Sequence, residues 1–292
     1  MTRFFQYVLN GIVVGSTYSL IGMGLTLIYG IMGIVNFAHG EFYMLGAYFL
    51  YTLWILWGIP PLLAMLLTFV VVFIFGIGLE QTLLRPLRKE PSTSSMLMTM
   101  GLSIVLQNAA LLIWGGEVQT VPPIIQASTL SIGDVVISTD RIFILIISLI
   151  IIMAASVFID KTKVGRSMRA TFQDVEAAEV VGVNIERVYC ITFGFGAALA
   201  SAGGFLLAPL YVTSPTMGTL ALGKAFAVVN VGGHGNVLGA IVGGLLIGVA
   251  ESLGAGYISS GYKDAFGFII MILVILFKPE GILGREKTGK AG

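Results

Sequence analysis

The chain contains few charged residues, and they are unevenly distributed. Only 11% of its 292 residues are charged and 57% are hydrophobic, whereas a soluble domain carries roughly a quarter charged residues. No Asp, Glu, Lys or Arg occurs in the stretches 42–79, 91–116 and 188–223. Each stretch exceeds the roughly 20 apolar residues that a helix needs to cross the hydrocarbon core of a membrane. This scarcity of charge excludes a water-soluble protein and predicts a polytopic membrane protein.

Alternation of polar and apolar residues is also missing from these stretches, which excludes the strands of a membrane β-barrel. Only helices and closed barrels satisfy their backbone groups in lipid. We therefore expect an all-α polytopic fold, a single transmembrane domain over residues 1–292 with about eight or nine spans. The expected spans are 7–31, 36–57, 60–80, 96–115, 142–159, 188–211, 237–252 and 264–278, with a shorter apolar piece at 218–231.

The sequence has little with which to build a catalytic or metal site. A single cysteine, Cys190, excludes an internal disulfide framework and any multi-cysteine metal site. The hydrolase motifs H-E-x-x-H and G-x-S-x-G are absent, as is the phosphate loop G-x-x-x-x-G-K-[ST]. A net charge of +1 does not favour nucleic acid as a partner. We expect no enzyme activity, no metal and no cofactor in this chain.

Lys and Arg, where they do occur, predict which side of the membrane each loop occupies. Twelve of the sixteen lie in 81–95, in 160–187 and in the tail from Lys278. Short loops rich in Lys and Arg face the cytoplasm, so these regions are predicted to be cytoplasmic. The segment 116–141 has one basic residue and is predicted to be external, with a strand pair within 130–138. The N-terminus is then outside if 218–231 crosses the membrane, and inside if that piece turns back.

Two similar pieces suggest an internal two-fold repeat. Residues 35–40 read VNFAHG and residues 229–235 read VNVGGHG, each followed closely by Leu-Gly-Ala. Both place glycine and polar residues within an apolar run, as discontinuous helices of transporters do. The candidates for such broken-helix turns, or for the translocation pathway, are Asn36, His39, Glu41, Asn230 and His234. The alternative is that these residues only cap interrupted helices.

The cytoplasmic loop 160–187 contains ten charged residues and one predicted short helix. Asp174 is a plausible N-cap, residues 175–181 the helix, and Gly182 its end. Seven residues are too few to hold a helix in water by propensity alone. Ala177, Ala178 and Val181 share one narrow face, which suggests docking against another protein; the alternative is a solvated loop.

Several motifs together resemble a known family. The sequence GRSMRA at 165–170, followed by Glu-Ala-Ala at 176–178 and Gly-Val-Asn at 182–184, resembles the cytoplasmic signature of ABC importer permeases. The stretch 36–47, NFAHGEFYMLGA, resembles the branched-chain amino-acid permeases of the LivH type. So do the small-residue run 194–204, GAIVGG at 239–244 and PEGILG at 279–284. One departure is the missing Leu-Pro after the Glu-Ala-Ala block, which is expected for this subclass.

The resemblance implies a membrane subunit of a bacterial ATP-driven importer in the inner membrane. It implies as partners a second, LivM-like permease subunit, two subunits that bind ATP, and a periplasmic or lipid-tethered substrate-binding protein. It implies that branched-chain amino acids are the substrates, with other amino acids, short amides or urea as alternatives. The residues expected to couple to the ATPase are Arg166, Arg169, Asp174, Glu176, Ala177, Ala178 and Gly182.

An ion-coupled secondary transporter is the rival class. Such a protein needs ionisable groups inside the membrane, where they are costly and usually functional. Glu41, Lys224 and Glu251 could serve in this way.

Overall fold

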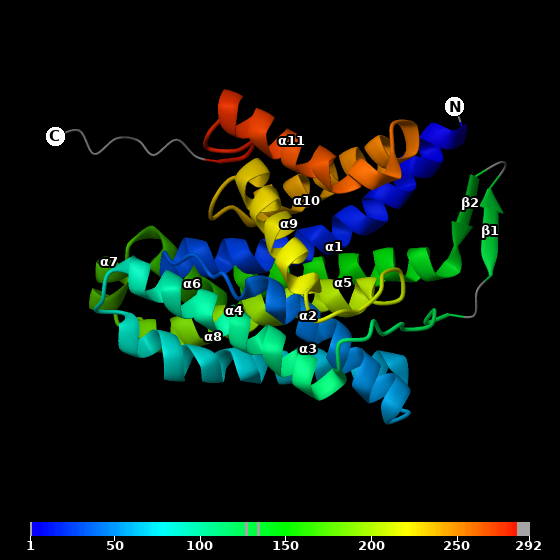
Figure 1. The fold of residues 1–292 in the computed structure, drawn as a ribbon. Coiled ribbons are helices and arrows are strands. Elements are labelled where there is room, and N and C mark those ends of the chain that lie inside the picture. Colours follow the sequence, from blue (N-terminus) through cyan, green and yellow to red (C-terminus); the bar gives the residue numbers. More distant parts are fainter. Residues whose placement is uncertain (1, 126–127, 133–134, 285–292) are drawn as a thin grey trace.

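A computed structural model of the protein describes residues 2–125, 128–132 and 135–284, and the described part of the chain is built mainly of helices (Figure 1). The helices are α1 (Thr2–Met32), α2 (His39–Leu50), α3 (Pro61–Leu79), α4 (Ser92–Trp114), α5 (Thr139–Lys161), α6 (Lys163–Gln173), α7 (Val175–Val180), α8 (Ile185–Leu207), α9 (Met217–Gly232), α10 (Val237–Tyr257) and α11 (Lys263–Phe277). Short 3-10 or π-helical turns extend α2 (Tyr51–Leu56) and α3 (Glu80–Leu84 and Arg85–Leu87) and precede α11 (Ser260–Tyr262). The predicted helical bundle is confirmed.

Seven of the described helices are long and apolar enough to cross a membrane, namely α1, α3, α4, α5, α8, α10 and α11 with their extensions. The shorter α2 and α9, of 12 and 16 residues, lie among them. The described chain therefore has nine segments at membrane depth, within the predicted range. The span expected over 36–57 begins only at His39, because residues 33–38 are not helical.

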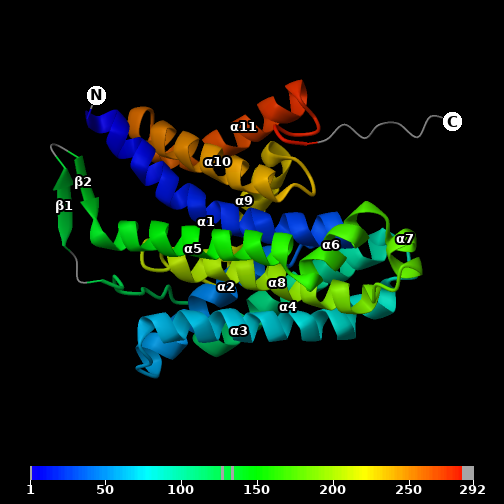
Figure 2. The same ribbon diagram turned by 180° about the vertical axis from the view of Figure 1, so that it is seen from behind.

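α1, α2 and α8 form the interior of the bundle. α1 packs along α10 and α8, and α2 is enclosed by α8, α9, α3 and α4. α11 lies on the outside, and only Gly267 of its residues is buried (Figure 2). Glycines permit the closest approach, as small residues do in membrane bundles. A Cβ atom at Gly11 would lie 2.5 Å from the Cα of Val249, and Gly15 meets Gly244 and Gly248 in the same way.

The segment 116–141, which is predicted to be external, contains the predicted strand pair. β1 (Thr129–Ile132) and β2 (Val135–Ser138) are antiparallel, with Thr129 opposite Ser138. This hairpin lies at the end of the bundle opposite to α6 and α7 (Figure 1).

The predicted cytoplasmic loops gather at one end of the bundle. The connection between α3 and α4 lies beside α6 and α7 (Figure 1), and its Arg85 forms an ion pair with Glu186 at the start of α8 (2.7 Å). Three basic residues of the tail, Arg285, Lys287 and Lys290, lie outside the described residues.

The segment 208–232 connects the two ends of the bundle, and its inner part is α9. Just before it, Thr213 exchanges backbone hydrogen bonds with Gln119 near the hairpin end. At its other end the Ile282 amide donates to the Val231 carbonyl (2.8 Å), which joins α9 to the tail. The segment 208–232 therefore counts as a crossing, so the first helix of the described chain begins at the hairpin end and the last one ends at the α7 end. Because the basic end is predicted to be cytoplasmic, the start of α1 is predicted to be outside.

This topology can be tested by alkaline-phosphatase fusions, which are active only outside the cytoplasm. Fusions after Lys89, Asn184 and Lys278 should be inactive, and a fusion after Glu117 should be active, because the basic loops stay inside. Activity at any of the first three positions would refute the assignment.

Candidate translocation and coupling site

The chain between α1 and α2 leaves the helical conformation inside the bundle. The Thr99 hydroxyl of α4 accepts a hydrogen bond from the Phe37 amide (3.1 Å) and donates to the Val35 carbonyl (3.3 Å). Thr99 is the eighth residue of α4, so this contact lies about 10 Å along the helix from its start. The Asn36 side chain accepts from the Ala38 amide (3.1 Å). Irregular backbone at membrane depth is tolerated where the protein itself satisfies it, and the Phe37 and Ala38 amides of this segment are satisfied in this way.

His39 is the first residue of α2 and is fully buried. Its Nε2 donates to the Ile21 carbonyl in the middle of α1 (3.0 Å). Its ring also lies against Gly24, where a Cβ atom would be 3.0 Å from Cε1. His39 thus fixes the start of α2 to the middle of α1.

Glu41 lies two residues further, where α2, α4 and α9 meet. One carboxylate oxygen accepts hydrogen bonds from the Ser103 hydroxyl (2.9 Å) and the Gln107 amide (2.7 Å) of α4. The other oxygen has no hydrogen-bond partner among the described residues and lies against Gly218 in the first turn of α9. The structure therefore places the predicted residues Asn36, His39 and Glu41 together along residues 33–41, here called the re-entrant segment.

The second predicted break is a turn between two separate helices, α9 and α10. Gly233 and Gly235 both have positive φ angles, +106° and +74°, and His234 lies between them. Asn236 caps α10 by accepting from the Gly239 amide (3.0 Å). Asn230 lies within the last turns of α9 and donates to the Phe226 carbonyl (2.8 Å).

The two histidines do not occupy equivalent positions. His39 opens α2, whereas His234 precedes the first residue of α10 by three positions. The two turns nevertheless approach each other, because the ring of His234 lies 5.1 Å from that of Tyr29 near the end of α1. The two-fold repeat itself stays a prediction.

The loop 160–187, here called the coupling loop after its predicted role, contains the predicted short helix. The Asp174 side chain accepts from the Ala177 amide (3.0 Å) and caps α7. Gly182 ends it with a φ of +87°, a conformation that glycine adopts without steric cost. An additional helix, α6, precedes it and was not predicted. Its buried face was readable from Val164, Met168 and Thr171, which recur at helical spacing.

The expected docking face of α7 needs a correction. Ala178 is only 3% exposed, and its carbonyl accepts from the Val183 amide (3.0 Å) within the same chain. So short a helix is stabilised by burying one face, and Ala178 lies on the buried face. The other two residues of the predicted face, Ala177 and Val181, are exposed, Val181 at 77%, and the neighbouring Val180 is 87% exposed.

The two arginines among the predicted coupling residues, Arg166 and Arg169, differ in their surroundings. Arg169 donates to the Ile159 carbonyl and lies 3.6 Å from Asp160, so it binds the C-terminal end of α5, where a cation is favoured. Arg166 is exposed, as are Glu176 and Ala177. Arg169 therefore makes its contacts within this chain.

Phe172 of α6 connects the coupling loop to both turns. Its ring lies against Gly30 near the end of α1 and against Gly235 in the turn before α10. At Gly235 a Cβ atom would lie 2.6 Å from the ring, so the ring would have to move. At Gly30 a Cβ atom would lie 3.2 Å from the ring, which is a tight contact. One aromatic residue in a charged loop was the only indication of this contact in the sequence.

A buried ion pair holds the last three helices to the core. Lys224 of α9 pairs with Glu251 of α10 and with Asp264 of α11 (3.0 Å). The Tyr18 hydroxyl of α1 donates to Glu251 (3.1 Å). Buried charges persist when they are paired and hydrogen-bonded, and Lys224 and Glu251 compensate each other in this way.

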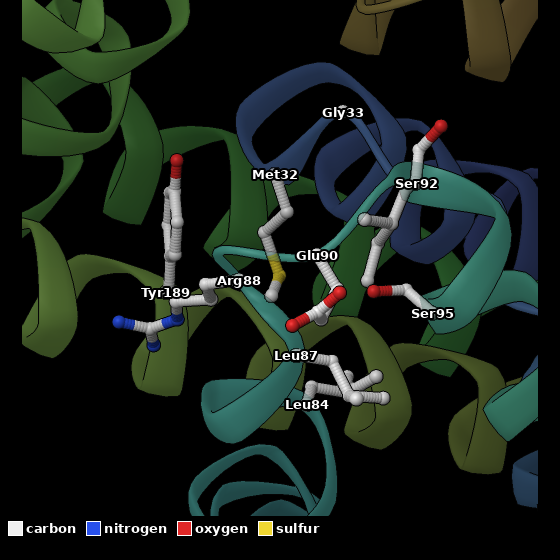
Figure 3. A pocket seen from close by; sticks show the side chains of 10 residues that line it. Met32, Gly33, Leu84, Leu87, Arg88, Glu90, Ser92, Ser95 and Tyr189 are labelled. Atoms are coloured by element: carbon white, nitrogen blue, oxygen red, sulfur yellow. The ribbon is translucent and has the colours of Figure 1, made fainter.

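A cavity of about 180 Å³ lies at the α7 end, beside the start of the non-helical residues 33–38 (Figure 3). Its lining includes Met32, Gly33, Ile34, Arg88, Ser95 and Tyr189. Arg88 lies over the Tyr189 ring (4.8 Å) and pairs with the buried Glu80, to which the Cys190 thiol also donates (2.7 Å). This network fixes the α3–α4 connection to α8.

The contact of Phe172 with the turns can be tested through protein stability. Gly235→Ala should lower the melting temperature of the purified protein more than Gly33→Ala. Both residues have positive φ, but a Cβ atom meets the Phe172 ring only at Gly235 and meets nothing within 4 Å at Gly33. Adding Phe172→Ala should restore part of the loss in Gly235→Ala. Equal losses in the two glycine variants would show that the ring does not constrain the turn.

Comparison with known proteins gives a consistent result over the whole chain. Residues 7–275 match the family described as "Branched-chain amino acid transport system / permease component". The high-affinity branched-chain amino acid transport system permease protein BraD of Pseudomonas aeruginosa is 38% identical, over 99% of this chain and 98% of its own length. LivH of Escherichia coli, a permease protein of the same description, is 36% identical over 98% and 97% of the two chains.

A solved structure has the same fold. It is PsaBC from Streptococcus pneumoniae in complex with Fab, with a TM-score of 0.51, 12% identity and coverage of 94% of this chain and 91% of the matched chain. Together with the nearly full-length sequence matches, the helical bundle and its re-entrant segment show that the chain belongs to the family of permease components of branched-chain amino acid transport systems.

Proposed function

We propose that this chain is the membrane-spanning permease subunit of an ATP-driven importer for branched-chain amino acids. The observation that carries the proposal is the similarity over nearly the whole length to permeases named for that transport. As a multi-pass protein of the bacterial inner membrane, the chain supplies the path for the substrate, and partner subunits supply the energy. Selection among leucine, isoleucine, valine and the alternatives named above is left to the binding protein.

The proposed assembly has four kinds of subunit. A LivM-like permease pairs with this chain, two subunits bind and hydrolyse ATP at the α7 end, and a binding protein delivers substrate at the hairpin end. The absence of a phosphate loop from the sequence supports separate ATP-binding subunits. The exposed valines of α7 support a protein partner at that end, because large apolar side chains exposed to water mark interaction sites.

Coupling would pass through α7 and α6 to the two turns. In this proposal Val180 and Val181 contact the ATP-binding subunit, together with Arg166, Glu176 and Ala177. Asp174 and Gly182 shape α7, and Ala178 and Arg169 anchor it to this chain. Phe172 then transmits a displacement of α6 to the turns at Gly30 and Gly235, beside His234.

The translocation pathway would follow the re-entrant segment. Asn36 and His39 hold residues 33–39 in place, Glu41 faces α4 and α9 across the break, and Asn230 stabilises the end of α9. The rival, an ion-coupled secondary transporter, has less support, because Lys224 and Glu251 neutralise each other and of the three candidates only Glu41 lacks an ion-pair partner.

Docking at α7 is tested by Val181→Asp. The variant should insert normally but fail to retain the ATP-binding subunits on purification, because an unpaired charge buried in a contact costs on the order of several kcal/mol. Val212→Asp is the control, since Val212 is an exposed valine (53%) at the hairpin end and should retain them. Retention by the Val181→Asp variant would contradict docking through this face.

The energy source is tested in liposomes that contain the complete importer. Leucine uptake with the binding protein should require internal ATP and continue when ionophores collapse the ion gradients, because the energy comes from the partner subunits. Uptake that needs a proton or sodium gradient but no ATP would establish the rival class instead.

A further inference from the structure

The surroundings of Glu41 suggest a role beyond closing the break between α1 and α2. Ser103 and Gln107, which donate to Glu41, are the twelfth and sixteenth of the 23 residues of α4. The carboxylate therefore lies near mid-depth in the membrane. α9 begins at the same depth, with Gly218 against the carboxylate and the Thr219 hydroxyl 3.3 Å from the Gln107 amide.

The Glu41 carboxylate has no cationic partner among the described residues. The residue is 1% exposed and forms none of the ion pairs found among the described residues. Its second oxygen has no hydrogen-bond partner in the described structure. An isolated buried carboxylate is costly, and ionisable groups at membrane depth usually mark the path of a substrate. By contrast, Lys224 and Glu251 are buried as an ion pair, so each charge is compensated by the other.

Polar side chains continue from Glu41 to the surface of the bundle. Ser103 and Gln107 are partly exposed, and Thr219 and Asn108 are exposed. Polar groups in the membrane face the bundle interior or a water-filled cavity, so this face is not expected to contact lipid. The opposite side of α4 is apolar: Val105, 200° around the helix from both Ser103 and Gln107, is 62% exposed.

We propose that Glu41, Ser103, Gln107 and Thr219, here called the Glu41 patch, bind the ammonium group of the amino acid as it passes through the membrane. The inference rests on the proposed function and adds the group that recognises the substrate. A carboxylate without a cationic partner accepts hydrogen bonds from an ammonium group, which has three donors and no acceptor. Gln107 donates to Glu41 in the absence of substrate and reaches Thr219 as an alternative partner. The passing ammonium group takes the place of the Gln107 amide at the carboxylate.

The test uses the complete importer in liposomes, with leucine as the probe. Glu41→Gln should lower leucine uptake about tenfold or more, the loss expected when a hydrogen bond to a charged group is removed. Stimulation of ATP hydrolysis by the binding protein should persist, because docking of that protein does not involve the patch. The melting temperature should be unchanged or raised, since the substitution removes a buried charge. Glu41→Asp keeps the charge and should recover part of the uptake.

Glu90→Gln is the matched control, because Glu90 is an exposed glutamate at the α7 end and should leave uptake unchanged. Normal uptake by Glu41→Gln would overturn the inference. So would a joint fall of uptake, ATP hydrolysis and melting temperature, which would show that Glu41 only stabilises the start of α9. If the wild-type importer itself fails to take up leucine, the proposed function fails, which is a separate outcome.

A second measurement probes the patch by chemical labelling instead of uptake. In a Cys190→Ser background, Thr219→Cys in the assembled importer should react with a cationic, water-soluble thiol reagent, and Val105→Cys should not. Adding Glu41→Gln should slow the reaction at position 219, because the carboxylate attracts the cation. Equal reaction at positions 105 and 219, or no effect of Glu41→Gln, would contradict the patch.

Discussion

Backbone groups that leave a helix inside the hydrocarbon layer must find hydrogen bonds within the protein, since lipid offers none. Residues 33–38 meet this constraint through the Thr99 hydroxyl and the Asn36 side chain. The rest of the bundle is arranged around the re-entrant segment. α2 begins deep inside and is buried on nearly all sides, so its neighbours must approach closely, and glycines such as Gly40, Gly46 and Gly204 make this possible.

The same arrangement links the membrane interior to the cytoplasmic end. The turns after α1 and before α10 meet at the ring of Phe172, which belongs to the coupling loop. In the proposed mechanism this contact passes a displacement of α6 to the turns, because the Phe172 ring, although 47% exposed, lies directly against both glycines. α9 extends the link, since one of its ends adjoins the second turn and the other begins beside Glu41. A movement at α6 can therefore reach both the turns and the polar face at mid-depth.

Much of this structure could be predicted from the sequence, and the limits have physical causes. Long charge-free stretches fix the number of spans, and Asp174 and Gly182 fix the ends of α7, because these signals are local. The partners of Glu41 and Phe172 depend on helices far apart in sequence, which no local pattern reveals. Ala178 was assigned to the wrong face for the same reason: the helix pattern defines a face but not what covers it. The paired histidines are not equivalent because residues 33–38 are not helical whereas Asn230 lies within a helix.

The central claim is that a polar face at mid-depth and an exposed α7 belong to one transport path. A cryo-electron microscopy map of the complete importer tests it most directly. The account predicts that Gln107 and Thr219 face a water-filled path toward the second permease subunit, and that Val180 and Val181 contact an ATP-binding subunit. A map in which the α4–α9 face lies against lipid, or in which α7 projects freely into water, would contradict it.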